Sequence, residues 1–201
     1  MTTDHVQERL SIIQEMIDRS RRETAESGRF FVWIGLISIV AVFVVRWIEA
    51  TGLTQLVLPA LAVVLVANGV VGYAAIARRQ KMVGARSYPA AVSTALWFAC
   101  GVAVALALFL FPVLGVYRWD QTPVLAALIM GVGAFASGSV FETPIIAWSS
   151  IAWWGGAVAL ALVDSAWPRG FIMAAVLLLG MVVPGLVLDR QYARQRGSDV
   201  S

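Results

Sequence analysis

The sequence has very few of the side chains that hold metals or cofactors. Its 201 residues include one histidine (His5), one cysteine (Cys100) and one lysine (Lys81). A lone cysteine forms no intramolecular disulfide, and with a lone histidine it cannot supply the clustered ligands of structural zinc or an iron–sulfur centre. Bis-histidine haem and a retinal Schiff base are excluded too, because His5 lies near the polar N-terminus and Lys81 in the polar run 78–81. We therefore expect no cofactor and no metal.

Charged residues are scarce as well, and this shortage sets the protein class. They make up 13% of the chain, whereas hydrophobic residues make up 60% and the mean hydropathy is +0.81. Soluble proteins have about one quarter charged and about one half apolar residues. The composition therefore predicts an integral membrane protein whose first partner is the lipid bilayer.

Six apolar runs have the length, about 17–25 residues, that crosses a hydrocarbon core of about 30 Å as a helix. They lie near 30–48, 56–77, 89–111, 123–140, 144–163 and 170–188. Thr122-Pro123 and Thr143-Pro144 each place a capping residue before a proline at the first helical position. The fold class is thus an all-α, polytopic bundle of six transmembrane helices, in which the fourth and fifth form a tight antiparallel hairpin.

Positive charge predicts the orientation of the bundle, because arginines in short loops resist translocation. With the N-terminus inside, twelve of the fifteen basic residues fall on the cytoplasmic side and three fall outside. The outer three are Arg46, Arg118 and Arg169, with Trp47, Trp119 and Trp167 beside them at the interface. We expect a multi-pass protein of the inner (plasma) membrane with both termini cytoplasmic. The net charge of +3 follows from this asymmetry and does not indicate nucleic-acid binding.

Residues 1–28 form the one long polar segment before the transmembrane domain at 29–189, which a short basic tail at 190–201 follows. Apolar residues recur there at helical spacing: Val6, Leu10, Ile13 and Ile17. A lipid-surface helix carries a basic polar face, but residues 4–26 have six acids against four arginines. We interpret the segment as a cytoplasmic amphipathic helix that packs on protein, either on its own bundle or on a partner or second copy.

The third span carries alanine at every fourth position: Ala91, Ala95, Ala99, Ala103 and Ala107. Helices associate in membranes through such close small-residue contacts, since lipid tails are as apolar as leucine. We interpret the ridge first as packing within the bundle and second as a contact between subunits.

Polar and aromatic residues at depth are the remaining candidates for a site. Asn68 is the deepest strongly polar side chain, and Trp97, Trp153 and Trp154 lie deeper than the interfacial belt. They could wall an apolar pocket, although packing, with each indole N–H given to a neighbouring carbonyl or hydroxyl, is the simpler interpretation. Glu142, in the short turn at 141–143, is expected to stabilise a helix end.

Arg46 and Glu49, three residues apart at the outer end of the first span, can pair there, and Asp120 and Asp164 also lie at outer edges of spans. No acid or base falls at mid-depth, which leaves proton relays and intramembrane proteases without their reactive groups. Pro184 predicts a kink near the inner end of the last span, tolerated because neighbouring helices can satisfy the carbonyl that proline leaves without a donor.

Some local features resemble known membrane proteins. The run Ile13-Gln14-Glu15-Met16-Ile17 precedes Gly28 and Trp33, and Val183-Pro184-Gly185 precedes a basic tail. In these features the chain resembles an uncharacterised family of six-span bacterial integral membrane proteins with an amphipathic N-terminal helix, a resemblance that implies no activity.

By size and span count the chain is also similar to the substrate-binding S components of energy-coupling-factor vitamin transporters. Those proteins meet their partner through an alanine surface on the first span, whereas here the ridge lies on the third.

Two functions follow as expectations. The first is a non-enzymatic accessory, regulatory or scaffold subunit that acts through helix contacts. The second is a small solute-binding permease subunit with an apolar pocket among Asn68, Trp97, Trp153 and Trp154. This function requires a cavity of roughly 300 Å³ or more among these residues.

Overall fold

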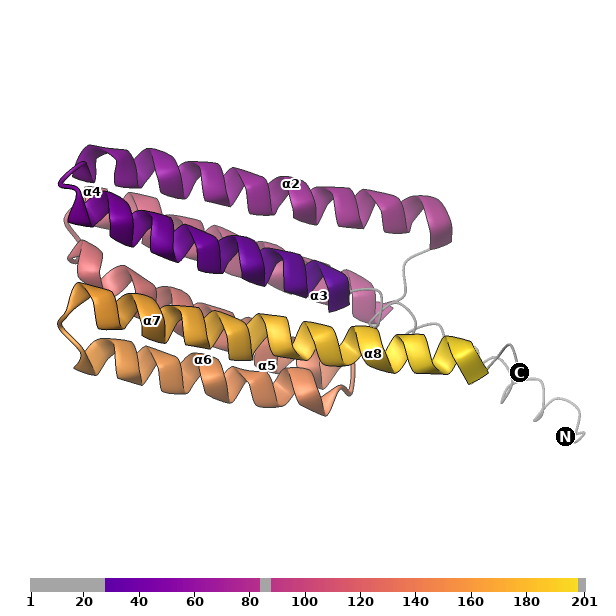
Figure 1. Ribbon diagram of the computed structural model, residues 1–201. Helices are drawn as coiled ribbons and strands as arrows, with labels where there is room; N and C mark the ends of the chain where they lie inside the picture. The colour runs from indigo at the N-terminus through magenta and orange to yellow at the C-terminus, as the bar shows by residue number, and fades with distance from the viewer. Residues whose placement is uncertain (1–27, 84–87, 199–201) are drawn as a thin grey trace, which may run out of the picture.

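The computed structural model describes residues 28–83 and 88–198, and the described residues form helices with no strand. Six helices are long and apolar enough to cross a membrane. Figure 1 shows them side by side with short connections at both ends. The predicted all-α transmembrane bundle is therefore confirmed, and the chain is a multi-pass membrane protein. The segment 1–27, with its predicted amphipathic helix, lies outside the described residues.

The helical bounds agree with the predicted spans to within a few residues at most ends. The first helix is Gly28–Ala50, drawn in indigo in Figure 1. The other elements are η1 (Thr54–Leu56), α2 (Val57–Val83), α3 (Tyr88–Ala105), η2 (Leu106–Leu110), α4 (Phe111–Val113), η3 (Trp119–Gln121), α5 (Thr122–Val140), α6 (Pro144–Leu162), α7 (Ala166–Leu177), η4 (Leu178–Val182) and α8 (Val183–Ser198). The largest difference is at the last span. There α8 continues ten residues past the predicted end at 188, because the prediction marks the end of the apolar run and the helix extends into the polar residues that follow it.

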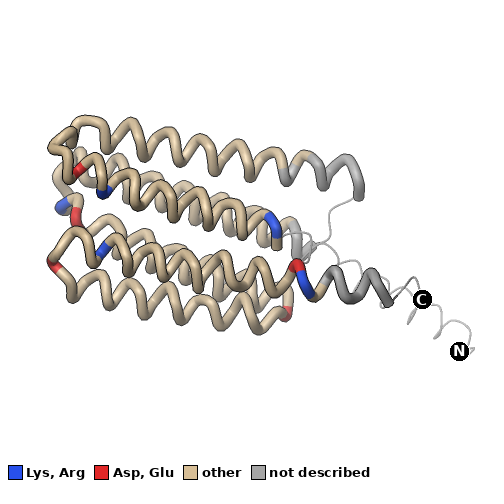
Figure 2. Tube along the Cα trace, in the orientation of Figure 1, with Lys and Arg blue, Asp and Glu red and all other residues tan. Residues whose placement is uncertain are grey.

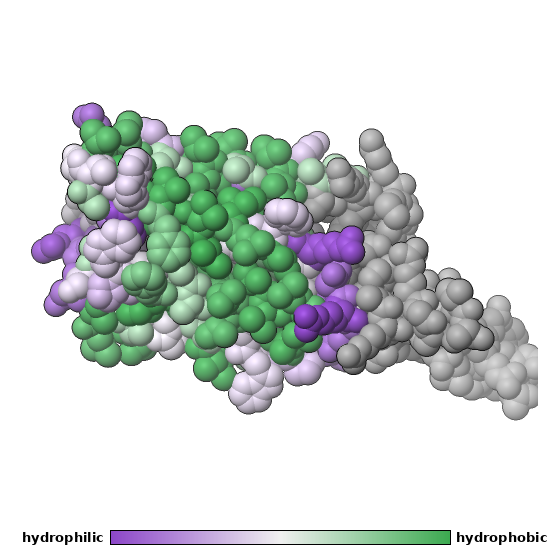
Figure 3. Space-filling view, viewed as in Figure 1, coloured by the Kyte–Doolittle hydropathy of each residue, from purple (hydrophilic) through white to green (hydrophobic). Residues whose placement is uncertain are grey.

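Charged residues of the described chain gather at the two ends of the bundle and leave its middle apolar (Figures 2 and 3). We call one end the Arg46 end; it holds Arg46, Glu49, Arg118, Asp120, Asp164 and Arg169. The opposite end holds Arg29, whose Nε lies 3.1 Å from Asp189 Oδ1. This contact places the start of the first helix beside the end of the last span, and the six spans of the described residues put these two ends on the same side.

The predicted hairpin of α5 and α6 is the most closely packed part of the protein. A Cβ atom at Gly138 would lie 2.3 Å from the backbone nitrogen of Ala147, and one at Gly131 would lie 2.3 Å from Trp154 Nε1. Only glycine permits this approach, because contacts under 3.0 Å are not found for real Cβ atoms. The two helices therefore pack backbone to backbone, with Trp154 lying across α5.

The hydrophobic core lies among α5, α6 and the last span, Ala166–Gln191. Its buried members are Ala127, Ala134, Trp153, Ala157, Leu160, Val176, Leu177 and Met181. We call these three spans the packed half; 39% to 44% of their apolar windows is buried. The first three spans are the open half, with buried shares of 22%, 0% and 17% in chain order.

Two prolines each follow a π-helical turn, η2 before Pro112 and η4 before Pro184. A proline has no N–H to donate to the preceding turn, so a carbonyl there needs another donor. Near Pro184 the Trp153 indole Nε1 donates to the Gly180 carbonyl at 3.3 Å, and near Pro112 the Tyr117 hydroxyl donates to the Ala107 carbonyl. A wide π-helical turn thus precedes Pro184, where the sequence predicts a kink, and a neighbouring helix supplies the donor.

Candidate intramembrane cavity

A cavity of about 1430 Å³, open over part of its boundary, lies between the open half and the packed half. Its walls come from all six described spans: the first helix, α2, the third span, α5, α6 and the last span. On α2 the lining side chains recur at helical spacing, at Val57, Leu61, Val64, Leu65 and Asn68. The inner face of α2 is therefore directed at the cavity rather than at a packed core, which explains why none of its membrane window is buried.

The cavity extends through most of the depth of the bundle. On the first helix the lining runs from Phe30 to Arg46 and Glu49, and sixteen residues of helix at 1.5 Å each span about 24 Å. One polar contact crosses between its walls at mid-depth, where Asn68 Nδ2 donates to Ser38 Oγ at 3.4 Å. The Asn68 Oδ1 atom is buried with no hydrogen-bond partner.

Three of the four predicted pocket residues line this cavity, namely Asn68, Trp97 and Trp153. The Trp97 ring packs edge-on against Phe31, with centroids 5.6 Å apart. Trp153 is 1% exposed and its N–H is given to Gly180, which is the packing interpretation of the sequence. Its ring therefore serves both the core and the cavity wall.

The fourth pocket residue, Trp154, and the predicted helix-end residue, Glu142, lie outside the cavity lining. Trp154 packs on Gly131 and Phe135, with the two ring centroids of Trp154 and Phe135 5.8 Å apart. Glu142 is exposed in the α5–α6 turn, where its backbone takes a left-handed conformation with φ 51°. Its N–H donates to the Ser139 carbonyl, so Glu142 closes the end of α5 through its backbone.

The predicted alanine ridge is divided by the fold. Ala107 is 3% exposed and Ala103 is half-buried, so the end of the ridge near α4 packs inside the bundle. Ala91, Ala95 and Ala99 are exposed. The proposed partner-contact residues Val6, Leu10, Ile13 and Ile17 lie outside the described residues.

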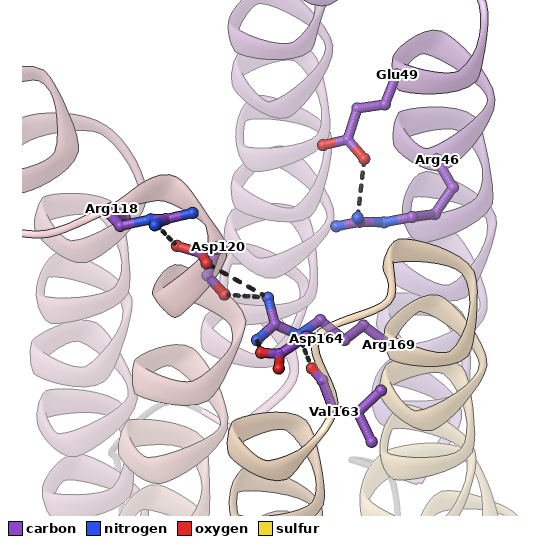
Figure 4. A network of polar contacts seen from close by, with 7 residues as sticks. All are labelled: Arg46, Glu49, Arg118, Asp120, Val163, Asp164 and Arg169. Carbon is purple, nitrogen blue, oxygen red and sulfur yellow. Dashed lines mark hydrogen bonds and ion pairs between the residues drawn. The ribbon is translucent and has the colours of Figure 1, made fainter.

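Among the described residues, the charged side chains that line the cavity lie at the Arg46 end, where they form a network of ion pairs (Figure 4), and we call this end of the cavity its mouth. On the first helix Arg46 Nη1 lies 2.8 Å from Glu49 Oε2, which is the i,i+3 pair that the sequence predicts. The Arg46 side chain is 19% exposed, and its Nε is buried without an acceptor in the described chain.

Arg169 forms the second part of the mouth, where the ends of three helices meet. Its guanidinium donates to the Val163 carbonyl and, at 3.3 Å, to the Asp120 carbonyl. It lies 3.8 Å from both the Asp120 and the Asp164 carboxylates. Arg118, which is 83% exposed, lies 3.3 Å from Asp120 on the water side.

The sequence placed these residues at outer helix ends without bringing them together. The order of the spans does predict that these residues share one side of the membrane. Arg46 lies at the end of the first span, and Asp120 and Arg169 lie at the starts of the fourth and sixth spans, which face the same side. Which helices are neighbours cannot be read from this order. The mouth is therefore the part of the site that sequence reasoning missed.

Tyr117 lies beside this mouth, between two spans. Burial raises the pKa of its phenol above the ordinary value. The hydroxyl thus stays protonated at neutral pH and remains the donor to the Ala107 carbonyl.

Fold and site together define the class: a six-helix, α-helical membrane protein with a large cavity whose charges are confined to one end. No protein family, no curated protein and no solved structure matches the chain.

Proposed function

We propose that this is a non-enzymatic membrane protein that binds a small molecule in its intramembrane cavity, as a solute-binding permease subunit does. The single observation that carries the proposal is the cavity of about 1430 Å³ lined by Asn68, Trp97 and Trp153. Sites for small molecules occupy about 300–1,000 Å³, are mostly apolar and include a few polar groups. The cavity meets this description, and its volume is above the upper end of that range.

The lining of the cavity indicates which kind of molecule would fill it. The cavity is open over part of its boundary, and most of its lining is apolar. Such walls bury apolar groups favourably and leave the polar groups of a solute without partners. An apolar or amphipathic occupant is therefore the filling that the walls favour.

The chemistry of the lining supports binding rather than catalysis. Between its two ends the polar side chains that line the cavity are amide, hydroxyl and indole groups, such as Asn68, Ser38 and Trp97. General acid–base or nucleophilic catalysis needs a titratable or activated group beside the reacting atom. The ionised groups instead stand at the mouth, paired with one another.

The test is native mass spectrometry of the protein extracted from its own membrane. We expect one retained non-protein molecule per chain. Gly101→Trp should expel it, since Gly101 lines the cavity and a Cβ there meets nothing within 4 Å. Gly155→Trp is the matched control, because Gly155 is equally open but lies outside the cavity lining. Bare protein in every sample would overturn the proposal.

A second candidate function, an accessory or scaffold subunit acting through helix contacts, is favoured by the exposure of Ala91, Ala95 and Ala99. Single cysteines placed at Ala95 in a Cys100→Ala background should crosslink to a second copy or a partner in the membrane. Val132, 54% exposed on α5, gives the control position. Equal crosslinking at both positions would contradict this function.

We further propose that the protein lies in a bacterial inner membrane with both termini cytoplasmic, and that residues 4–26 form its contact element there. The excess of arginine on one side of the bundle supports the orientation. Cysteines introduced at Gly115 should react with an impermeant reagent in whole cells, whereas reaction only after lysis would reverse the orientation.

A further inference from the structure

We infer that the cavity binds a long-chain amphiphile whose anionic head group lies at Arg46 and Arg169 and whose chain follows the apolar wall. This inference rests on the proposed function and adds the chemical class of the ligand. Two kinds of molecule have this chemistry, namely a fatty acid and an anionic phospholipid. Both carry an acyl chain and an anionic group, which is a carboxylate in the first and a phosphate in the second.

The separation of polar and apolar lining along the cavity supports an amphiphile. Among the described residues, the charged side chains of the lining stand at the mouth, and below it the wall is built from apolar side chains such as Leu61, Leu65, Val104 and Leu108. A wholly polar solute would leave its polar groups unsatisfied against this wall. A wholly apolar one would make no use of the six charged side chains at the mouth.

Cavity dimensions support a long chain. The volume of about 1430 Å³ is above the about 300–1,000 Å³ of sites for drug-sized ligands. The lining from Arg46 to Phe30 on the first helix extends about 24 Å, which is most of a hydrocarbon core of about 30 Å. An extended chain can therefore lie along it with its head at the mouth.

The depths of the charges at the mouth indicate the sign of the head group. The two least exposed charged side chains are basic, Arg169 at 12% and Arg46 at 19%. The acids lie nearer water, with Glu49 at 35%, Asp120 at 39% and Asp164 fully exposed. A head group that enters from the apolar side thus meets guanidinium before carboxylate.

Arg46 also has donors to spare. A guanidinium has five N–H groups, and the ion pair with Glu49 uses one nitrogen, Nη1, while Nε has no acceptor in the described chain. Carboxylate and phosphate oxygens match the planar fork of arginine and make strong charge-assisted hydrogen bonds with it. Arg46 is therefore the residue that we expect to distinguish an anionic head from a neutral one.

The experiment is a native mass spectrometric titration of the full-length protein, stripped of lipid in a neutral detergent. The probes are a long-chain fatty acid, a phosphatidic acid and a monoacylglycerol, which is the neutral control. We expect both anionic probes to bind at least about tenfold more tightly than the neutral one. A preference between the first two tells whether the head is a carboxylate or a phosphate.

Four variants separate the role of the guanidinium from charge balance and from folding. Arg46→Gln should weaken anionic binding about tenfold, and the double variant Arg46→Gln/Glu49→Gln, which restores neutrality, should remain as weak. Glu49→Gln should bind at least as tightly as the unmodified protein. Arg29→Gln, an exposed arginine at the opposite end outside the cavity lining, should change nothing.

The outcomes distinguish this inference from the proposed function. Equal affinity for neutral and anionic probes, or equal behaviour of the Arg46 and Arg29 variants, would overturn the anionic head group while leaving the cavity a binding site. Failure of every probe to bind the unmodified protein would overturn the amphiphile, whereas the proposed function is overturned separately, by bare protein in every sample extracted from the membrane. Restoration of binding in the double variant would show that charge balance, and not Arg46, recognises the head.

Discussion

α6 and α2 are both apolar helices of transmembrane length, yet they are packed in opposite ways. α6 has 39% of its window buried and contacts α5 and the last span along its length, whereas none of the α2 window is buried. Both have high hydropathy, 1.6 for α6 and 2.1 for α2. The more apolar helix is thus the less buried one.

The difference shows what holds membrane helices together. Lipid tails solvate apolar side chains as well as protein does, so apolar character alone drives no packing. α6 packs because Gly138 and Gly131 of α5 admit the Ala147 backbone and the Trp154 ring. α2 has Gly69, but a Cβ there would meet nothing within 4 Å. Gly69 therefore makes no close helix contact and lines the cavity instead.

The largest expected effect is on the glycine contact of the packed half. Gly138→Ala should destabilise the protein by about 3 kcal/mol, because the added methyl group meets backbone that cannot rotate away. Gly69→Ala is the control in the open half and should change stability by under about 1 kcal/mol. Unfolding in mixed micelles measures both. Similar losses at the two positions would remove the distinction between the halves.

A smaller effect is expected where Trp153 donates to Gly180. Trp153→Phe should cost about 1–3 kcal/mol by leaving a buried carbonyl without a donor. In a Pro184→Ala background the backbone N–H restored at position 184 can donate to the Gly180 carbonyl. The same Trp153 substitution should then lower the free energy of unfolding by less. A double-mutant cycle measures the coupling. Strictly additive losses would show that the indole does not compensate for the proline.

Tyr117→Phe should destabilise the protein by about 1 kcal/mol through loss of the donor to Ala107. Because folding raises the pKa of this phenol, its contribution is complete below about pH 10, the unfolded value, and is lost as the pH rises through the folded value. Tyr73→Phe, at a side chain 75% exposed, is the control. A Tyr117 effect that is constant up to pH 12 would contradict the donor role.

The smallest effect concerns the hydrogen bond between Asn68 of α2 and Ser38 of the first helix. Asn68→Leu should cost about 0.6 kcal/mol, the mean for hydrogen bonds between membrane helices. It should also broaden the distance between spin labels at Leu36 and Val66, which are exposed on the two helices. An unchanged distribution would show that other contacts hold α2.

Much of the fold was predictable from sequence, because span length and helix caps are local properties. Thr122-Pro123 and Thr143-Pro144 marked the starts of α5 and α6 to within one residue, and the Arg46–Glu49 pair followed from i,i+3 spacing. The predicted capping role was wrong for the side chains: Gln121 is the N-cap of α5, and neither Thr122 nor Thr143 makes a side-chain capping hydrogen bond. A donor for the carbonyl that Pro184 leaves unpaired was also expected, although its identity as Trp153 was not.

The rest depends on which faces of apolar helices meet, and composition carries little information about that in a membrane. Trp153 and Trp154 are adjacent and chemically identical, yet one lines the cavity and the other packs on Gly131. The exposed part of the alanine ridge, at Ala91 to Ala99, has the same spacing as the buried part. The grouping of Arg46 with Arg169 requires helix neighbours that no local pattern specifies.

The most direct test of the account is the structure of the protein in a nanodisc, determined by electron cryomicroscopy at a resolution that shows side chains. We expect the inner face of α2 to stand apart from α3, with elongated density along Leu61 and Leu65 that ends at Arg46. Side chains of α2 interdigitated directly with those of α3, with no space between them, would contradict the central claim that the open half is built around a bound molecule.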